Sequence, residues 1–104
     1  MTDVLSSLTY ETAKTFLGQN FQIRFDDGAT IDLTLEEVLL LMEKHVNPRM
    51  KRDTFSMQFR GPLEPGLRQG MYPTYHEQLG GPIQLFLVPL NRGENGYLYE
   101  AVFN

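Results

Sequence analysis

The feature that most constrains the fold is a pair of alternating segments on either side of an Asp-Asp-Gly turn. Apolar and polar side chains alternate in FQIRF, residues 21–25, and the alternation resumes in ATIDLTL, residues 29–35. A period of two is typical of a strand with one buried face. Gly28 accepts the positive φ angle that a tight turn requires. The pattern predicts an antiparallel hairpin in which Asp26 and Asp27 are turn residues rather than a catalytic carboxylate pair.

Four later segments also predict strands. Alternation in TFSMQFR, residues 54–60, and in YLYEAVFN, residues 97–104, indicates one buried face in each strand. PIQLFLVPL, residues 82–90, is apolar on both faces, which predicts a strand that is covered on both sides. MYPTYH, residues 71–76, predicts a short strand that Pro73 restricts to an edge or a bulge.

The N-terminal segment LTYETAKTFLGQN, residues 8–20, predicts a short helix. Thr9 is its expected N-cap, and Gly18 is its expected stop. Together with the strands, this helix predicts a single domain over residues 1–104 of the α+β class. We expect a mostly antiparallel, strongly bent sheet or a small β-barrel with one or two short helices, because short strands separated by Gly-rich corners favour closure.

A second helix is predicted within TLEEVLLLMEKHVNP, residues 34–48. Thr34 and Glu37 fit a capping box at the start of this segment. This favours a helix from about Leu35 to His45. The alternative is a strand that continues from Leu33 through a bulge.

Composition argues against several classes of function. The chain has no Cys, which excludes disulfides and thiolate metal sites. Its formal net charge of −4 disfavours non-specific binding to nucleic acid, which requires a basic surface. No apolar stretch approaches the roughly 20 residues of a membrane span, and the N-terminus lacks the basic and apolar regions of a signal peptide. We therefore expect a cytoplasmic protein that contacts neither nucleic acid nor membrane.

The sequence contains no familiar arrangement of catalytic or metal-binding residues. The two histidines, His45 and His76, lack the spacing of paired metal ligands. No serine lies in a nucleophile elbow, and no Gly motif is suited to phosphate. Glu100 lies within an apolar strand, where a carboxylate needs a partner, and Arg60 is the expected partner in a structural ion pair. We expect no catalytic residue, no metal and no cofactor.

The stretch FRGPLEPGLRQGMYPTYHEQLGG, residues 59–81, carries more polar and aromatic side chains than its turns require. Gly and Pro account for the turns themselves. Arg and Tyr are common hot spots of interfaces, and loops on a rigid sheet often hold binding residues. We predict that the remaining side chains form a binding surface made of Arg60, Arg68, Gln69, Tyr72 and His76.

Five motifs in the second half resemble an uncharacterised family of small bacterial domains of unknown function. They are FSMQFRGP (Phe55–Pro62), QGMY (Gln69–Tyr72), HEQLG (His76–Gly80), LFLVP (Leu85–Pro89) and YEAVFN (Tyr99–Asn104). The first half matches loosely, and the family more often continues as a strand where LLLMEKHVNP, residues 39–48, predicts a helix. The resemblance implies a bacterial source and genomic proximity to phage-tail-collar-like proteins, and it brings no known activity.

These observations favour a non-catalytic accessory or assembly module that acts through contact with a protein partner of unknown identity. The resemblance adds an association with phage-tail-like proteins. One alternative is a small-molecule or carbohydrate-binding β-barrel that uses Tyr72, Tyr75 and Tyr97, and a second is an enzyme of unknown class. A deep pocket lined by those tyrosines would favour the binding barrel, whereas a shallow surface would favour the assembly module.

Overall fold

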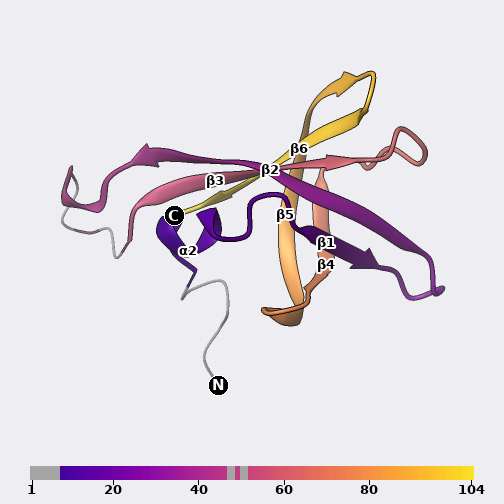
Figure 1. The fold of residues 1–104 in the computed structure, drawn as a ribbon, viewed down its shortest axis with the longest axis horizontal. Helices are drawn as coiled ribbons and strands as arrows, with labels where there is room; N and C mark the ends of the chain where they lie inside the picture. Colours follow the sequence, from indigo (N-terminus) through magenta and orange to yellow (C-terminus); the bar gives the residue numbers. More distant parts are fainter. Residues whose placement is uncertain (1–7, 47–48, 50–51) are drawn as a thin grey trace.

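The computed structural model describes residues 8–46, 49 and 52–104. Within these residues the chain forms one short α-helix, six strands and one 3-10 helix (Figure 1). In chain order they are α2 (Tyr10–Lys14), β1 (Asn20–Arg24), β2 (Thr30–Met42), η1 (Lys44–Val46), β3 (Thr54–Gly61), β4 (Gly70–His76), β5 (Gly80–Gly93) and β6 (Gly96–Phe103). None of the helices in this part of the chain is long and apolar enough to cross a membrane.

The six strands of the described residues pair in a closed ring, and every neighbouring pair is antiparallel. The order around the ring is β1-β2-β3-β6-β5-β4. β4 returns to β1 through two residue pairs, Gln22 with Tyr75 and Ile23 with Thr74. The predicted mostly antiparallel sheet with a short helix is therefore confirmed, and its bending brings β1 and β4 together.

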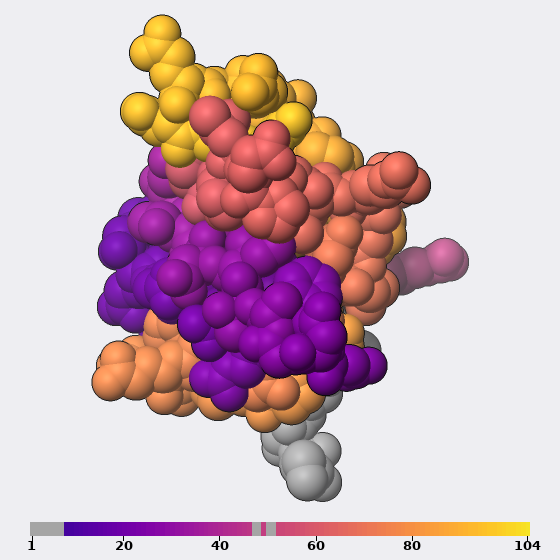
Figure 2. Space-filling model, turned by 90° about the vertical axis from the view of Figure 1, so that its right-hand side faces the viewer, coloured from indigo at the N-terminus to yellow at the C-terminus, as the bar shows by residue number. Residues whose placement is uncertain are grey.

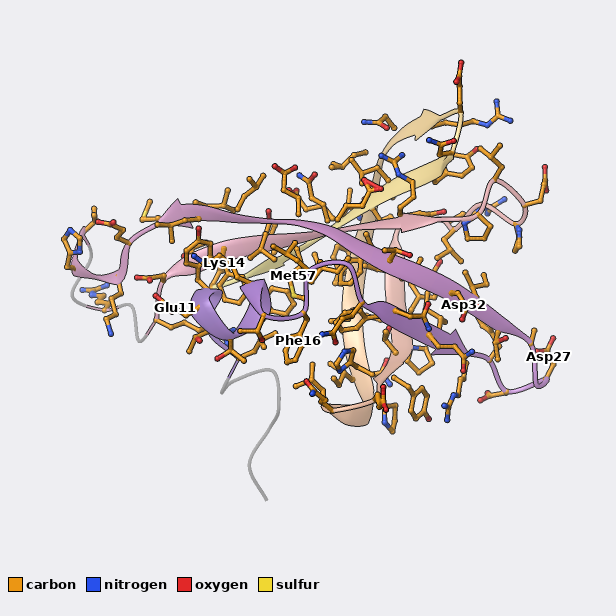
Figure 3. All side chains as sticks on the ribbon, in the orientation of Figure 1. Glu11, Lys14, Phe16, Asp27, Asp32 and Met57 are labelled. Atoms are coloured by element: carbon orange, nitrogen blue, oxygen red, sulfur yellow. The ribbon has the colours of Figure 1, made fainter. Side chains whose placement is uncertain are left out.

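The hairpin predicted around the Asp-Asp-Gly turn is present between β1 and β2. Gly28 has a φ angle of 91°, which is the conformation that a glycine accepts at little cost. Oδ1 of Asp27 accepts a hydrogen bond from the backbone amide of Ala29 at 2.9 Å. Asp27 lies at the tip of the turn (Figure 3). Asp26 belongs to the same turn, so both aspartates are turn residues, as predicted.

The helix predicted over residues 35–45 is wrong, and the alternative of a continuing strand is correct. β2 remains a strand as far as Met42, and η1 follows it. The physical reason is a β-bulge, since the pairing with β3 shifts register between Leu35 and Glu37. The extra residue leaves Leu35 and Val38 buried, three positions apart. A spacing of three is also the spacing of a helix face, so a bulged strand imitates an amphipathic helix in the sequence.

Apolar side chains of the strands fill the inside of the ring. The buried members are Phe21, Ile23, Ile31, Leu33, Leu35, Val38, Phe55, Met57, Phe59, Ile83, Leu85, Leu87, Tyr99, Ala101 and Phe103. The space between Phe21, Met57, Thr74 and Leu85 amounts to about 10 Å³. That is about the volume of one water probe, so this part of the interior is a packed core rather than a ligand cavity.

The helix α2 and the residues that follow it pack onto this core. Oγ1 of Thr9 accepts a hydrogen bond from the backbone amide of Thr12 at 3.1 Å, so Thr9 is the N-cap, as predicted. Phe16 is buried and meets Phe21 edge-on at a centroid distance of 6.4 Å. Figure 3 shows Phe16 and Met57 in the region between the helix and the strands. The helix therefore contributes to the same core as the ring.

The loop between β3 and β4, residues 62–69, packs against the ring through two tyrosines. The backbone amide of Leu67 donates to the hydroxyl of Tyr99 at 2.8 Å. The hydroxyl of Tyr72 donates to the carbonyl oxygen of Arg68 at 2.6 Å. Figure 2 shows this loop, coloured salmon, between the β1–β2 hairpin in violet and the β5–β6 hairpin in yellow. The second half of the loop is thus fixed to the ring.

The expectation that β5 is covered on both sides is wrong. β5 is buried on one face only: Ile83, Leu85 and Leu87 are buried, whereas Phe86 is 47% exposed. Of the two alternatives for β4, the edge strand is wrong, because β4 pairs with both β1 and β5, whereas a register shift in the pairing with β5 is present between Thr74 and His76. Pro73 lies outside the two residue pairs between β4 and β1, so its missing N–H group interrupts no pairing with β1.

Candidate functional site

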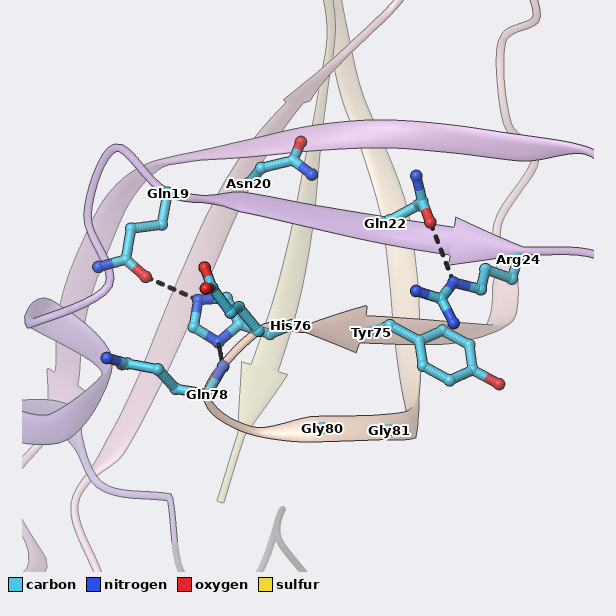
Figure 4. Close-up of a pocket in the computed structure, with 10 residues that line it drawn as sticks. Gln19, Asn20, Gln22, Arg24, Tyr75, His76, Gln78, Gly80 and Gly81 are labelled. Atoms are coloured by element: carbon cyan, nitrogen blue, oxygen red, sulfur yellow. Dashed lines mark hydrogen bonds between the residues drawn. The ribbon is translucent and has the colours of Figure 1, made fainter.

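A polar groove of about 790 Å³ lies between β1 and the turn that joins β4 to β5 (Figure 4). Its lining includes Asn20, Gln22 and Arg24 of β1, Tyr75 and His76 of β4, and Gln78 of the turn. The alternation of β1 produces one wall of this groove. Phe21 and Ile23 are buried in the ring, so the polar side chains that alternate with them along β1 point outward.

Arg24 is held in a fixed position at one end of the polar groove. Its Nε donates a hydrogen bond to Oε1 of Gln22 at 3.0 Å, and Nε2 of Gln22 donates to Oδ1 of Asp32 at 3.1 Å. The guanidinium carbon of Arg24 lies 4.0 Å from the centroid of the Tyr75 ring, within cation–π range. A Cβ atom at Gly81 would lie 2.6 Å from a carbon of the same ring. The backbone of β5 thus supports the ring of Tyr75, and the ring supports Arg24.

His76 joins three segments at the other end of the groove (Figure 4). Its Nδ1 accepts hydrogen bonds from the backbone amides of Gln78 at 3.1 Å and Leu79 at 3.3 Å. An amide N–H can only donate, so Nδ1 carries no proton. Nε2 therefore carries the proton and donates it to Oε1 of Gln19 at 2.7 Å. The ring also lies 4.5 Å from the ring of Phe21, measured between centroids.

This geometry makes His76 a structural residue. It is 5% exposed, and burial lowers the pKa of its imidazole below the ordinary value of 6.5, while the carboxylate of Glu77 acts in the opposite direction. Protonation would add a hydrogen to Nδ1, where two backbone amides already donate. A lone pair occupied in this way is not available to take a proton from a substrate. Nδ1 of His76 is therefore engaged in holding the β4–β5 turn.

The predicted ion pair between Arg60 and Glu100 is wrong. Arg60 instead donates from Nε and Nη2 to the carboxylate of Glu36, at 3.0 and 3.1 Å, and from Nη1 to the carbonyl oxygen of Gly96 at 3.1 Å. These hydrogen bonds lower the pKa of the Glu36 carboxyl below 4.5. Glu100 lies opposite Gln58 in the register and accepts a hydrogen bond from its side chain at 3.4 Å. The register places Arg60 opposite Leu98, and the bulge of β2 brings Glu36 within its reach.

The five residues predicted to form one binding surface do not lie together. Arg68 and Gln69 are exposed on the loop, and they line one shallow groove beside it. Tyr72 is half-buried, and lines a second groove that also includes Arg68. Arg60 lies on the outer face of β3, and His76 is buried at the far end of β4. Only the loop residues and Tyr72 therefore remain close to one another among these five.

The three tyrosines that the binding-barrel alternative requires do not share a pocket. Tyr75 lines the polar groove, whereas Tyr97 and Tyr72 line two separate grooves beside the 62–69 loop. The ring of Tyr72 also packs edge-on against the ring of Phe25, at a centroid distance of 6.2 Å. Within the described ranges, no group of three or more His, Cys, Asp or Glu residues is arranged to hold a metal ion.

Sequence reasoning missed the wall of the polar groove formed by Asn20, Gln22 and Arg24. The alternation of β1 indicates that these side chains face outward, but an outward polar side chain on a strand is ordinary. What distinguishes them is the pairing of Gln22 with Tyr75 on β4. That pairing joins segments far apart in the sequence, and no local pattern specifies it.

The comparisons with known proteins identify a family without assigning an activity. Residues 8–103 match the family described as domain of unknown function (DUF6916), and the chain belongs to this family. No curated protein and no solved structure matches the chain. The predicted membership of an uncharacterised family is therefore confirmed.

Proposed function

We propose that this protein is a non-catalytic accessory or assembly module that acts through protein–protein contact. The observation that carries the proposal is a concentration of exposed apolar side chains at one extremity of the molecule. We name this region the distal arm and define it as residues 38–46 of β2 and η1 together with residues 101–103 of β6. In Figure 1 the far ends of β2 and β3 extend to the left, away from β4 and β5.

The distal arm holds five of the nine exposed large hydrophobic side chains of the described residues. They are Leu40, Leu41, Met42, Val46 and Val102, and their exposed fractions lie between 38% and 64%. Single exposed apolar side chains are ordinary, but a group of them marks an interaction site more often than chance. The apolar run that imitates a helix in the sequence is thus the part of β2 that the ring leaves uncovered.

The backbone of β2 adds a second reason for contact at this place. β1 pairs with β2 no further than Thr34, and the hydrogen bonds of Leu35 with Gly18 and Gln19 end this contact. β3 pairs with β2 as far as Met42. The opposite edge of β2 beyond Leu35 therefore has no strand partner among the described residues. A long apolar edge strand is a template for pairing with another chain.

The remainder of the molecule supports a scaffold rather than a catalyst. We regard the closed ring as a small, filled β-barrel, whose packed core holds the distal arm in place. His76 is occupied by backbone amides, and Arg60 is neutralised by Glu36. Neither of these predicted surface residues is free to react with a substrate.

A bacterial source, a cytoplasmic location and an association with phage-tail-like proteins complete the proposal. The motifs in residues 55–104 support the source and the association, through their resemblance to a bacterial family found beside phage-tail-collar-like proteins. The absence of Cys is compatible with a reducing compartment. The partner we expect is a protein that presents an apolar strand or apolar side chains to the edge of β2.

The test compares co-purification of tagged variants from the native host. Leu41→Ser combined with Met42→Ser should abolish recovery of a stoichiometric partner, while the thermal melting temperature stays unchanged. Phe86→Ser is the matched control, since Phe86 is equally exposed but lies on β5. Equal recovery of the partner with all three proteins would contradict a role for the distal arm. Recovery of no partner with the wild-type chain would contradict the proposed function itself.

A further inference from the structure

We propose that the polar groove binds a small organic ligand through a carboxylate group of that ligand, which Arg24 receives. The groove lies on β1, β4 and the β4–β5 turn, whereas the distal arm lies on β2 and β6. The two sites do not share residues. The ligand site is therefore independent of the proposed protein contact, and each can fail alone.

Arg24 is a cation that the fold orients without neutralising. Among the described residues Arg24 makes no salt bridge, and its one side-chain hydrogen bond is donated from Nε to the neutral side-chain amide of Gln22. Arg60 is the contrasting case in the same molecule. It donates two hydrogen bonds to the carboxylate of Glu36 and a third to the carbonyl oxygen of Gly96. The two Nη atoms of Arg24 thus retain the fork of donors that a planar carboxylate matches.

The uncharged side-chain amide of Gln22 lies between Arg24 and Asp32 in the chain of hydrogen bonds, so the guanidinium of Arg24 is not neutralised by this carboxylate. Asp32 is the acidic residue nearest in the register, and it lies directly opposite Gln22 on β2. The NH₂ group of Gln22 donates a hydrogen bond to the carboxylate of Asp32, and the amide oxygen of Gln22 accepts one from Arg24. A carboxylate in place of this amide would neutralise the guanidinium. Gln22 instead fixes the orientation of Arg24 without changing its charge.

Pre-organisation strengthens the case for a binding site. A free arginine side chain loses rotamer entropy when it grips a ligand. Arg24 has already lost part of that freedom, because Gln22 holds its Nε and the Tyr75 ring lies against its guanidinium. Gly81 lets the backbone of β5 approach this ring, since any Cβ there would collide with it. The arrangement is thus built by residues from two hairpins.

The rest of the groove selects the class of ligand. Apart from Arg24, the polar side chains along it are mainly amides, among them Asn20 and Gln78, which suit hydroxyl or amide groups. Glu77 also lines the groove and disfavours a ligand with two negative charges. Because the single cation, Arg24, shares the groove with the carboxylate of Glu77, a ligand with one negative charge fits better than a phosphate. We therefore expect an acidic sugar or an acylated amino acid rather than a phosphorylated compound.

The test is a titration of the ¹⁵N-labelled wild-type chain followed by NMR. The probes are sodium glucuronate and N-acetylglutamine as carboxylates with one negative charge each, glucose as the neutral analogue and inorganic phosphate as the alternative anion, all at constant ionic strength. Saturable shifts of the Arg24 Nε–H and the side-chain amides of Asn20 and Gln78 are expected with at least one carboxylate, at a Kd of about 1 mM. The tighter of the two carboxylates assigns the ligand to sugars or to amino-acid derivatives.

Two variants separate this site from a general anion effect. Arg24→Gln should weaken carboxylate binding about tenfold or more, the size expected for loss of a charge-assisted hydrogen bond. Arg68→Gln removes the same charge from the exposed loop and should leave the affinity unchanged. Absence of saturable shifts with both carboxylates would overturn the proposal. So would equal shifts in Arg24→Gln, or tighter binding of phosphate or glucose than of either carboxylate.

Discussion

The guanidinium of Arg60 donates two hydrogen bonds to the carboxylate of Glu36, which lies in the bulge of β2. The pair fastens the bulge to β3. The two side chains are 25% and 41% exposed, so solvent screens their attraction. A double-mutant cycle with Arg60→Gln and Glu36→Gln should give a coupling free energy of about 0.5–1 kcal/mol in urea unfolding.

A second cycle with Arg60→Gln and Glu100→Gln provides the control for this prediction. Glu100 accepts its hydrogen bond from Gln58, so its coupling to Arg60 should be clearly smaller than that of Glu36. The hydrogen bonds from Arg60 hold the pKa of Glu36 below 4.5, so their stabilising effect is present above that pH and declines as the pH falls further. A larger coupling with Glu100 would contradict the assigned pair.

The buried imidazole of His76 should make stability depend on pH. Its pKa in the folded chain lies below the ordinary value of 6.5, so the unfolded chain takes up a proton first as the pH falls. The stabilising effect is complete above about pH 6.5 and is lost progressively as the pH falls toward the folded pKa. Urea unfolding of the wild type and of His76→Phe, at a series of pH values, measures this difference.

His45 supplies the matched control for the pH experiment. It is exposed and lies 3.1 Å from the carboxylate of Glu43, outside the core. His45→Gln should therefore retain the wild-type decline of stability below about pH 6.5, whereas His76→Phe should show a shallower one. An NMR titration that places the pKa of His76 above 6.5 would contradict the assigned tautomer and its hydrogen bonds.

Neighbouring residues of β5 should differ sharply in their effect on stability. Leu87 is fully buried in the ring, so Leu87→Ala should lower the free energy of unfolding by about 2–5 kcal/mol. Phe86 faces outward and is 47% exposed, so Phe86→Ala should cost clearly less. Denaturant unfolding of both variants measures the difference. Equal losses would mean that the strand is covered on both faces.

The last strand should be indispensable for folding. Phe103 is buried, and its ring stacks on that of Phe55 at a centroid distance of 5.1 Å. Ala101 is buried opposite Met57 in the same register. Truncation after Glu100 removes these contacts, worth about 1.5–3 kcal/mol for a large apolar side chain, from a total stability of about 5–15 kcal/mol. A cooperative melt at the wild-type temperature, measured by circular dichroism, would contradict this prediction.

Local patterns predict the elements whose causes are local. The alternation around Gly28 specifies the β1–β2 hairpin, and Thr9 specifies the start of α2, because a turn and a cap depend on adjacent residues. The bulge at Glu36 and Glu37 is different. It is stabilised by a hydrogen-bonded pair with Arg60 on another strand, which no local window contains. The sequence therefore predicts a helix where tertiary pairing produces a strand.

The candidate site is less predictable for the same reason. Arg60 and His76 attract attention as polar residues among turns, and both are satisfied inside the fold by partners from elsewhere in the chain. Arg24 attracts none, because it is one of several outward residues on an ordinary strand. Its significance arises from the pairing of β1 with β4, which places it over Tyr75. A side chain with unused hydrogen-bond donors can be recognised only when the hydrogen-bond partners of all the polar side chains are known.

Hydrogen–deuterium exchange of the purified partner complex tests the proposed contact most directly. The amides of residues 36–42 on β2 should exchange more slowly in the complex than in the isolated chain, because the partner covers the strand edge that β1 leaves open. The amides of β4 and of β5 near Phe86 should exchange at the same rate in both states. Protection confined to β4 and β5, with residues 36–42 unchanged, would contradict the distal arm as the contact surface.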